Sequence, residues 1–168
     1  MRLILIALFL LVSTPAMAAQ QCYSLEQLEA EQGLRIHTEL MIIALNCQHL
    51  VDPSIQLNHQ YEQFTNKNIG LIKRYEDTMR AVFRAEGRPN SESDLNDFRT
   101  MLANRIANEA VRLQPNVFCR AYSGLITQAN NMDQPHFRKW AQTVFAGYPL
   151  THPMCPGVTP PTQAAPAH

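Results

Sequence analysis

The chain has 168 residues, of which 46% are hydrophobic and 17% are charged, and its 14 basic residues equal its 14 acidic residues in number. A formal charge of zero provides no basic field that would hold nucleic acid, and no acidic excess of the kind found in disordered tails. The length suits one domain, so an enzyme built from two lobes around a cleft is not expected.

Residues 1–18 have the pattern of a secretory signal peptide. Arg2 supplies a positive charge, an apolar run covers residues 3–12, and small residues stand at Ala16 and Ala18. This order predicts cleavage after Ala18 and export to the periplasm or the extracellular space. The apolar run is too short to span a bilayer and no later stretch approaches the necessary length, so we expect no transmembrane segment after cleavage.

The first expected helix begins after Ser24. Ser24 and Gln27 have the spacing of a capping box, in which each side chain binds the backbone N–H of the other residue. Apolar residues then recur at intervals of three and four in a wide stripe that includes Leu45 and Leu50. Pro53 is expected to end this helix, because proline cannot continue one.

Two further long helices are expected next. Residues 57–86 carry apolar side chains spaced by three and four, and Gly87 is well placed as a C-terminal stop. The following helix should start after Ser91 or Ser93, because acidic residues occupy what would be its first turns. Pro115 is expected to close it.

The last two expected helices are shorter. One runs from Asn116, as its cap, to Ala129, and the other has Pro135 in its first turn and stops at Gly147. No useful segment alternates with a period of two, so the sequence predicts an all-α, up-down bundle of four to five helices. The Pro-rich residues 156–168 are expected to form a flexible tail.

The four cysteines allow three pairings, and helix geometry selects one of them. If the first helix is continuous, Cys22 and Cys47 lie at its opposite ends, which excludes a disulfide between them unless the helix breaks at Gly33. In an up-down bundle the third helix rises to the level of Cys47, and Cys119 starts the next helix there. We therefore expect the pairs Cys47–Cys119 and Cys22–Cys155, two structural bonds within a helical domain of residues 19–155.

The candidate catalytic residues are Glu39 and His37. A carboxylate in front of a strongly apolar run can have a raised pKa, as general acids often do. The alternative is that Glu39 pairs with an arginine of a neighbouring helix, such as Arg105 or Arg112, and is structural. The chain contains none of the zinc, haem, phosphate-loop or dinucleotide motifs sought, so no cofactor is expected and catalysis is not the leading interpretation.

The candidate metal ligands are His152 and Met154. With Cys155 they place three soft donor atoms within four residues, a pattern that suits copper. If Cys155 is oxidised it has no thiolate to offer, and the alternative is an extended tail that holds no metal.

Arg80, Arg84 and Arg88 are the candidate partner-binding residues. They follow Glu76 at intervals of four and so share one face of the second long helix. Such a stripe could bind an anionic partner. The alternative is a solvated face that includes a Glu76–Arg80 ion pair.

The runs 38–41 and 44–47, followed far downstream by Phe118 and Cys119, resemble short secreted helical proteins of Gram-negative bacteria. This resemblance covers the helices and implies neither an activity nor a functional residue. The leading hypothesis is an exported helical protein that binds another envelope or extracellular protein, for example as an inhibitor or immunity factor. The alternatives are a periplasmic carrier of a small ligand or metal, and a hydrolase that uses the two candidate catalytic residues.

Overall fold

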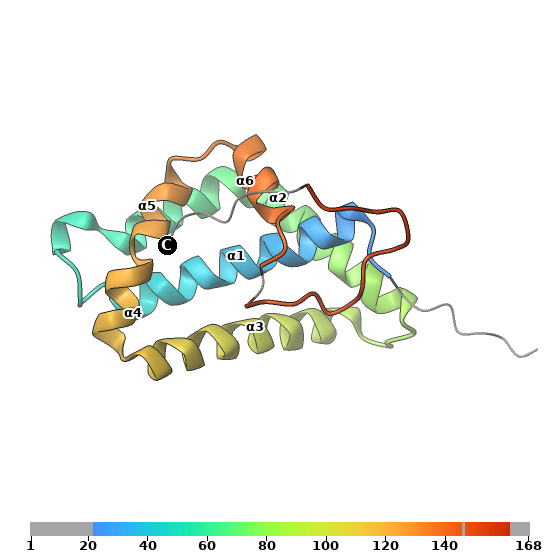
Figure 1. The fold of residues 1–168 in the computed structure, drawn as a ribbon, viewed down its shortest axis with the longest axis horizontal. Helices are drawn as coiled ribbons and strands as arrows, with labels where there is room; N and C mark the ends of the chain where they lie inside the picture. The colour runs from blue at the N-terminus through green and yellow to red at the C-terminus, as the bar shows by residue number, and fades with distance from the viewer. Residues whose placement is uncertain (1–21, 146, 162–168) are drawn as a thin grey trace, which may run out of the picture.

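The computed structural model describes residues 22–145 and 147–161, and the predicted signal peptide lies outside them (Figure 1). Three long helices are followed by three short ones: α1 (Leu25–Cys47), α2 (Leu57–Ala85), α3 (Ser91–Leu113), α4 (Pro115–Tyr122), α5 (Gly124–Asn130) and α6 (Gln134–Ala141), with a 3-10 helix at Pro53–Ile55. Within the described residues the chain forms no β-sheet, only two isolated bridges. The prediction of an all-α bundle is confirmed.

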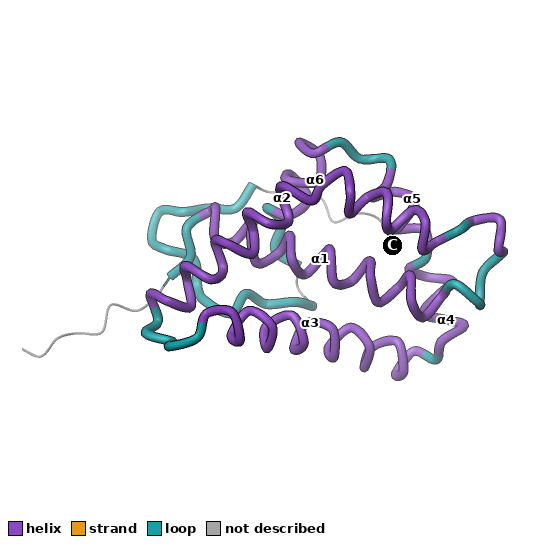
Figure 2. Tube along the Cα trace, turned by 180° about the vertical axis from the view of Figure 1, so that it is seen from behind, coloured by secondary structure: helices purple, strands orange, loops and turns teal. Residues whose placement is uncertain are grey.

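The helix α1 runs through the middle of the molecule. Figures 1 and 2 show α3 along one side of it and the short helices α5 and α6 on the other, and α1 also packs against α2. As a result, every residue from Leu28 to Thr38 is buried. A helix enclosed on all sides must place its polar side chains among protein atoms, and these side chains therefore need partners.

Local sequence signals fix the helix ends. The predicted capping box is present, since Gln27 N–H donates to Ser24 Oγ at 3.3 Å and Ser24 N–H donates to Gln27 Oε1 at 2.8 Å. The predicted stop of α2 is present too. Gly87 has a φ of 76°, and the N–H of Arg88 donates to the carbonyl of Phe83 across it, which is a Schellman motif.

Several helix ends differ from the predictions. α1 ends at Cys47, well before the proline expected to stop it. Pro115 is the first residue of α4, which is tolerated because a first-turn N–H has no acceptor within its helix. The single helix expected after Pro115 is interrupted at Ser123, where serine and glycine lower the helix propensity. α6 ends at Ala141 and does not reach Gly147.

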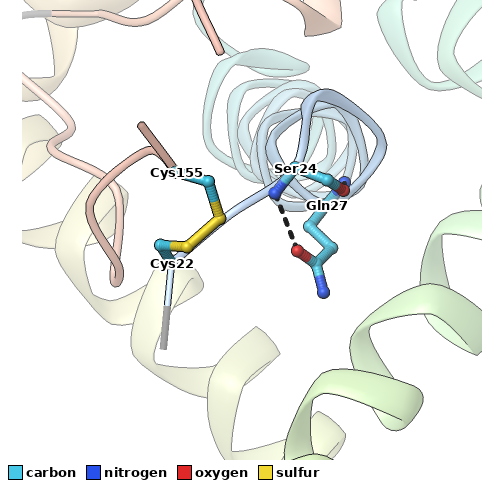
Figure 3. The surroundings of a disulfide bond; sticks show 4 residues. All are labelled: Cys22, Ser24, Gln27 and Cys155. Carbon is cyan, nitrogen blue, oxygen red and sulfur yellow. Dashed lines mark hydrogen bonds between the residues drawn. A yellow bond between two sulfur atoms is a disulfide. The ribbon is translucent and has the colours of Figure 1, made fainter. Parts of the chain in front are cut away.

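The disulfides pair as predicted. Cys47 and Cys119 have Cα atoms 5.3 Å apart, and those of Cys22 and Cys155 are 4.7 Å apart. Figure 3 shows the second bond beside the capping residue Ser24, at the start of α1. The two disulfides therefore lie at the two ends of α1, and their presence is compatible with an exported protein.

Gly33 allows α2 to approach α1 closely. A Cβ atom at this position would lie 2.2 Å from Cε2 of Tyr75, far inside van der Waals contact. The Tyr75 ring in turn packs against Phe137 of α6, and Phe137 packs edge-on against Phe64 at 4.9 Å between ring centroids. One missing side chain on α1 thus gives room to the aromatic cluster that joins α1, α2 and α6.

After α6 the chain returns along α1 as an extended segment, residues 147–155, here called the return segment. Its Pro153 carbonyl accepts from Tyr23 N–H at 2.8 Å, and Cys155 N–H donates to the Tyr23 carbonyl at 3.0 Å. Thr151 donates its N–H to Glu31 Oε1 at 3.0 Å and its hydroxyl to Glu31 Oε2 at 2.5 Å. The return segment therefore covers the N-terminal half of α1 (Figure 1).

Candidate functional site

The two halves of α1 bury different chemistry. Between residues 29 and 38 the buried polar side chains are Glu29, Glu31, Gln32, Arg35, His37 and Thr38. Between residues 40 and 47 the buried side chains are Leu40, Ile43, Ala44 and Cys47. Burying a charge is costly unless it is paired, so the partners of the first group determine what this half of the molecule can do chemically.

Glu29 is the centre of the most extensive polar cluster. Its Oε1 accepts from Tyr75 Oη at 2.9 Å and from Arg138 Nε at 2.7 Å, and its Oε2 accepts from Arg138 Nη2 at 3.1 Å and Gln142 Nε2 at 2.7 Å. Burial alone would raise the pKa of Glu29, but these hydrogen bonds outweigh it and lower that pKa below its usual value. Glu29 is therefore an ionised carboxylate held in one orientation.

A half-open cavity of about 420 Å³ lies beside Glu29, between α1, α2 and α6, and we call it the α1/α2/α6 cleft. Its polar lining comes from all three helices, and its apolar lining is Leu25 and Leu71. Two exposed charges face it from opposite helices, Glu26 on α1 and Arg74 on α2. Within the described residues, neither of these two side chains has an ion pair or a hydrogen bond.

The candidate catalytic residues do not form a common site. The Oε2 atom of Glu39 accepts from Arg35 Nη1 at 2.7 Å, so its partner is an arginine four residues earlier on the same helix. The arginines expected to pair with it are engaged elsewhere, Arg105 with the carbonyl of Gly147 at 2.7 Å and Arg112 with a glutamate at 3.5 Å. The structural alternative for Glu39 thus has a partner, although not one of those expected.

His37 lies on another side of α1 and faces α2. Its Nε2 is 3.0 Å from Tyr61 Oη and 3.2 Å from Thr65 Oγ1, and its ring stacks on that of Tyr61. Burial, with a smaller contribution from the positive charge of Arg99, lowers the pKa of His37 to about 4. The imidazole is therefore neutral near pH 7, and it is directed away from Glu39 because residues two apart on a helix do not share a face.

The candidate metal ligands lie on the return segment. His152 Nε2 is 3.0 Å from Glu86 Oε1, and the His152 ring lies against that of Tyr23 at 4.8 Å. Met154 is half-buried in the bridge to Tyr23, and the sulfur of Cys155 is in a disulfide. In the part of the chain that the structure describes, no three His, Cys, Asp or Glu side chains gather as metal ligands.

Arg80 and Arg84 lie on α2 among acidic side chains, whereas Arg88 follows Gly87 beyond the end of α2, so the three arginines do not share one helix face as expected. Arg80 pairs with Glu76 at 3.6 Å, as the solvated-face interpretation expects, and with two further carboxylates at 2.7 and 2.8 Å. Arg88 pairs with Glu86 at 2.7 Å, whereas Arg84 is exposed near the end of the helix. Much of the positive charge of the stripe is thus neutralised within the protein itself.

Large apolar side chains are exposed at the end of the bundle that the Cys47–Cys119 disulfide closes. We call this region the apolar end and define it by Leu45, Leu50, Ile55, Val111 and Val117. Leu45 lies in the last turn of α1, and Leu50 and Ile55 lie between α1 and α2. Val111 lies in the last turn of α3 and Val117 in the first turn of α4. Leu45 is 55% exposed and Val111 is 76% exposed. Leu45 and Leu50, which periodicity places on the wide apolar stripe of the first helix, are thus both exposed.

The backbone at the apolar end is also unusual. Among the described residues, the non-glycine residues with positive φ are Gln56, at 51°, and Gln114, at 67°. They cap the start of α2 and the end of α3, within the two connections that form the apolar end. A left-handed conformation costs a residue other than glycine of order 1 kcal/mol, so the surrounding structure holds these turns in place.

The apolar end has a signal in the sequence that periodicity does not report. Residues 40–61 contain a single Asp, Glu, Lys or Arg, which is Asp52, and residues 113–132 contain only Arg120. Long stretches with so few charges are unusual where the chain is exposed at helix connections. The Glu29–Arg138 pair had no such signal, because its partners are 109 positions apart.

These features define a disulfide-linked helical bundle with an internal polar cluster at one end and an exposed apolar surface at the other. No protein family matches the chain, and no curated protein or solved structure is significantly similar to it. No helix within the described ranges is both long and apolar enough to cross a membrane.

Proposed function

We propose that this protein is exported and binds another envelope or extracellular protein through the apolar end, without catalysing a reaction. The observation that carries the proposal is the group of large apolar side chains exposed at that end. Single exposed apolar residues are common on protein surfaces, but several of them at one end of a bundle, on two segments joined by a disulfide, are typical of an interaction site.

The composition around the apolar end supports a protein partner. The centres of protein interfaces are poor in charged residues, and the segments 40–61 and 113–132 contain one charged residue each. This composition does not suit an anionic lipid surface or nucleic acid, both of which attract clusters of lysine and arginine. The partner should therefore present an apolar face with few charges.

The covalent structure also supports binding. The Cys47–Cys119 bond joins the last residue of α1 to α4, and so links the two chain segments that carry the exposed apolar residues. A surface that is already fixed loses less conformational entropy when it binds, so more of the contact energy appears as affinity. An inhibitor or immunity factor would be one form of such a protein, and the disulfides suit an oxidising compartment.

A capture experiment with matched variants tests the proposal. The tagged mature protein would be crosslinked in envelope extracts of the cells that make it, beside Leu45→Arg and Ile69→Arg. Ile69 is the control because it lies on α2, outside the apolar end, and is 58% exposed, close to the 55% of Leu45.

We expect one partner to be recovered with the wild type and with Ile69→Arg, and at least tenfold less of it with Leu45→Arg. Equal recovery with all three proteins, or no reproducible partner, would contradict the proposal. If the captured protein is a second copy of the same chain, the apolar end is a dimer contact and the proposed partner is wrong.

A further inference from the structure

The α1/α2/α6 cleft has a fixed floor. Glu29 receives four hydrogen bonds, from Tyr75, Gln142 and two nitrogens of Arg138, so its charge is neutralised and its orientation is set. Because the floor is already satisfied, it does not need a ligand to complete it. It presents a rigid surface against which a small molecule can be positioned.

Other polar groups that line the cleft remain free to bind a ligand. Arg74 on α2 is exposed and, among the described residues, forms no ion pair or hydrogen bond; the same is true of Glu26 on α1. Arg138 is 53% exposed and uses Nε and Nη2 for Glu29, which leaves its Nη1 for another acceptor. The cleft therefore offers donors from α2 and α6 and one carboxylate acceptor from α1.

These charges favour a ligand that carries both signs. An anion alone would be attracted by Arg74 and could accept from the free Nη1 of Arg138, but it would lie near the unpaired carboxylate of Glu26. A cation alone would be attracted by Glu26 and repelled by Arg74. A molecule with a carboxylate and an ammonium group close together can satisfy both sides. Leu25 and Leu71 add an apolar surface for the rest of the ligand.

We propose that the α1/α2/α6 cleft binds a free α-amino acid with an apolar side chain. Its carboxylate lies toward Arg74 and Arg138, its ammonium group toward Glu26, and its side chain against Leu25 and Leu71. Bidentate guanidinium–carboxylate pairing supplies orientation as well as energy. The cavity of about 420 Å³ has room for such a molecule. This binding activity is separate from protein binding at the apolar end.

Titration calorimetry of the intact mature protein tests the assignment. The probes would be leucine, valine, methionine and phenylalanine, together with N-acetyl-leucine, which lacks the ammonium charge, and leucinamide, which lacks the carboxylate. We expect at least one of the four amino acids to bind. Where leucine binds, each singly charged analogue should bind at least tenfold more weakly. Absence of binding by all four, or equal binding of leucine and its two analogues, would overturn the proposal.

Variants locate the site. Arg74→Gln should weaken amino-acid binding at least tenfold, and Glu26→Gln should weaken it without weakening N-acetyl-leucine. Lys73→Gln is the matched control, because Lys73 is the neighbouring exposed cation on α2 and pairs with Asp77 outside the cleft. Binding that survives Arg74→Gln unchanged would show that the ligand lies elsewhere. Leu45→Arg should leave amino-acid binding intact, which separates this proposal from the one at the apolar end.

Discussion

The two ends of α1 differ in what they bury and in what they expose. At the Cys22–Cys155 end, α1 encloses carboxylates, a guanidinium and an imidazole, each with a polar partner. At the Cys47–Cys119 end it buries apolar side chains, and further apolar side chains lie on the surface. Both ends are closed by a disulfide, so the difference does not arise from covalent structure.

The surface charges follow the same division. Residues 73–99, which form the turn between α2 and α3 and the helix segments beside it, contain twelve charged residues. Many of these pair with one another, as Arg80 does with Glu92 at 2.7 Å. At the apolar end the segments 40–61 and 113–132 contain one charged residue each, and the exposed Arg112 beside Val111 pairs with Glu109 at 3.5 Å. The charged residues of segment 73–99 therefore stabilise the fold by pairing with one another. The exposed apolar side chains of the apolar end are not needed for folding and are available for binding.

Removal of the disulfides should have the largest effect. The bonded residues are 72 positions apart in Cys47–Cys119 and 133 apart in Cys22–Cys155. In the chain-entropy treatment, replacing each pair by serine lowers the free energy of unfolding by about 4 and about 5 kcal/mol respectively. Urea unfolding of the two double variants measures this. If either variant kept wild-type stability, that end of the bundle would not depend on its disulfide.

Acid should lower the free energy of unfolding through His37, which is buried in the N-terminal half of α1. Its pKa is about 4 in the folded protein and about 6.5 when unfolded, so between these values only the unfolded chain takes up the proton. Stability from this group is complete above pH 6.5 and is lost as the pH falls toward 4, by about 3 kcal/mol in total.

The control for this prediction is a histidine variant beside the apolar end. His37→Gln should remove that part of the pH dependence, whereas His59→Gln, at an exposed histidine beside the apolar end, should retain it. Urea unfolding at several pH values between 4 and 7 provides the measurement. Identical pH profiles for the wild type and His37→Gln would show that the folded protein accommodates the charged imidazole.

Glu29→Gln should cost about 2 kcal/mol of stability, because the neutral amide weakens the charge-assisted bonds from Arg138 and places a donor among donors. This loss of stability is smaller than that expected for a fully buried ion pair, because Arg138 is half exposed. The control is Glu26→Gln, in the same cleft but exposed, which should change stability by less than about 0.5 kcal/mol. Equal effects of the two variants in thermal unfolding would mean that the polar cluster does not stabilise the fold.

The smallest effect is expected at the apolar end. Leu45→Arg should alter the free energy of unfolding by no more than about 0.5 kcal/mol, since the site is exposed and a cation near a helix C-terminus is favourable. Urea unfolding of the variant and the wild type measures this change in the free energy of unfolding. A loss above about 1.5 kcal/mol would show that Leu45 supports the fold, and the contrast between the two ends would then be weaker.

The sequence could predict features that depend on neighbouring residues or on helix geometry. The capping box at Ser24, the stop at Gly87 and the two disulfide pairs are of this kind. The Arg35–Glu39 pair could also have been predicted from the sequence, because residues four apart on a helix are neighbours.

The remaining features depend on how the helices pack. Periodicity places Leu45 on a wide apolar stripe but does not say which edge of that stripe a neighbour covers. The contact between Glu29 and Arg138 joins α1 to α6, and no local pattern links them. For the same reason, the α1/α2/α6 cleft could not be located before the three helices were placed relative to one another.

Site-specific photo-crosslinking tests the central claim most directly. A photoreactive amino acid would replace Leu45 or Val117 at the apolar end, or Ile69 on α2, in the intact protein within the cells that make it. We expect an adduct with the same single protein from positions 45 and 117, and none from position 69. Adducts from position 69 with none from position 117 would contradict the assignment of the apolar end as the binding surface.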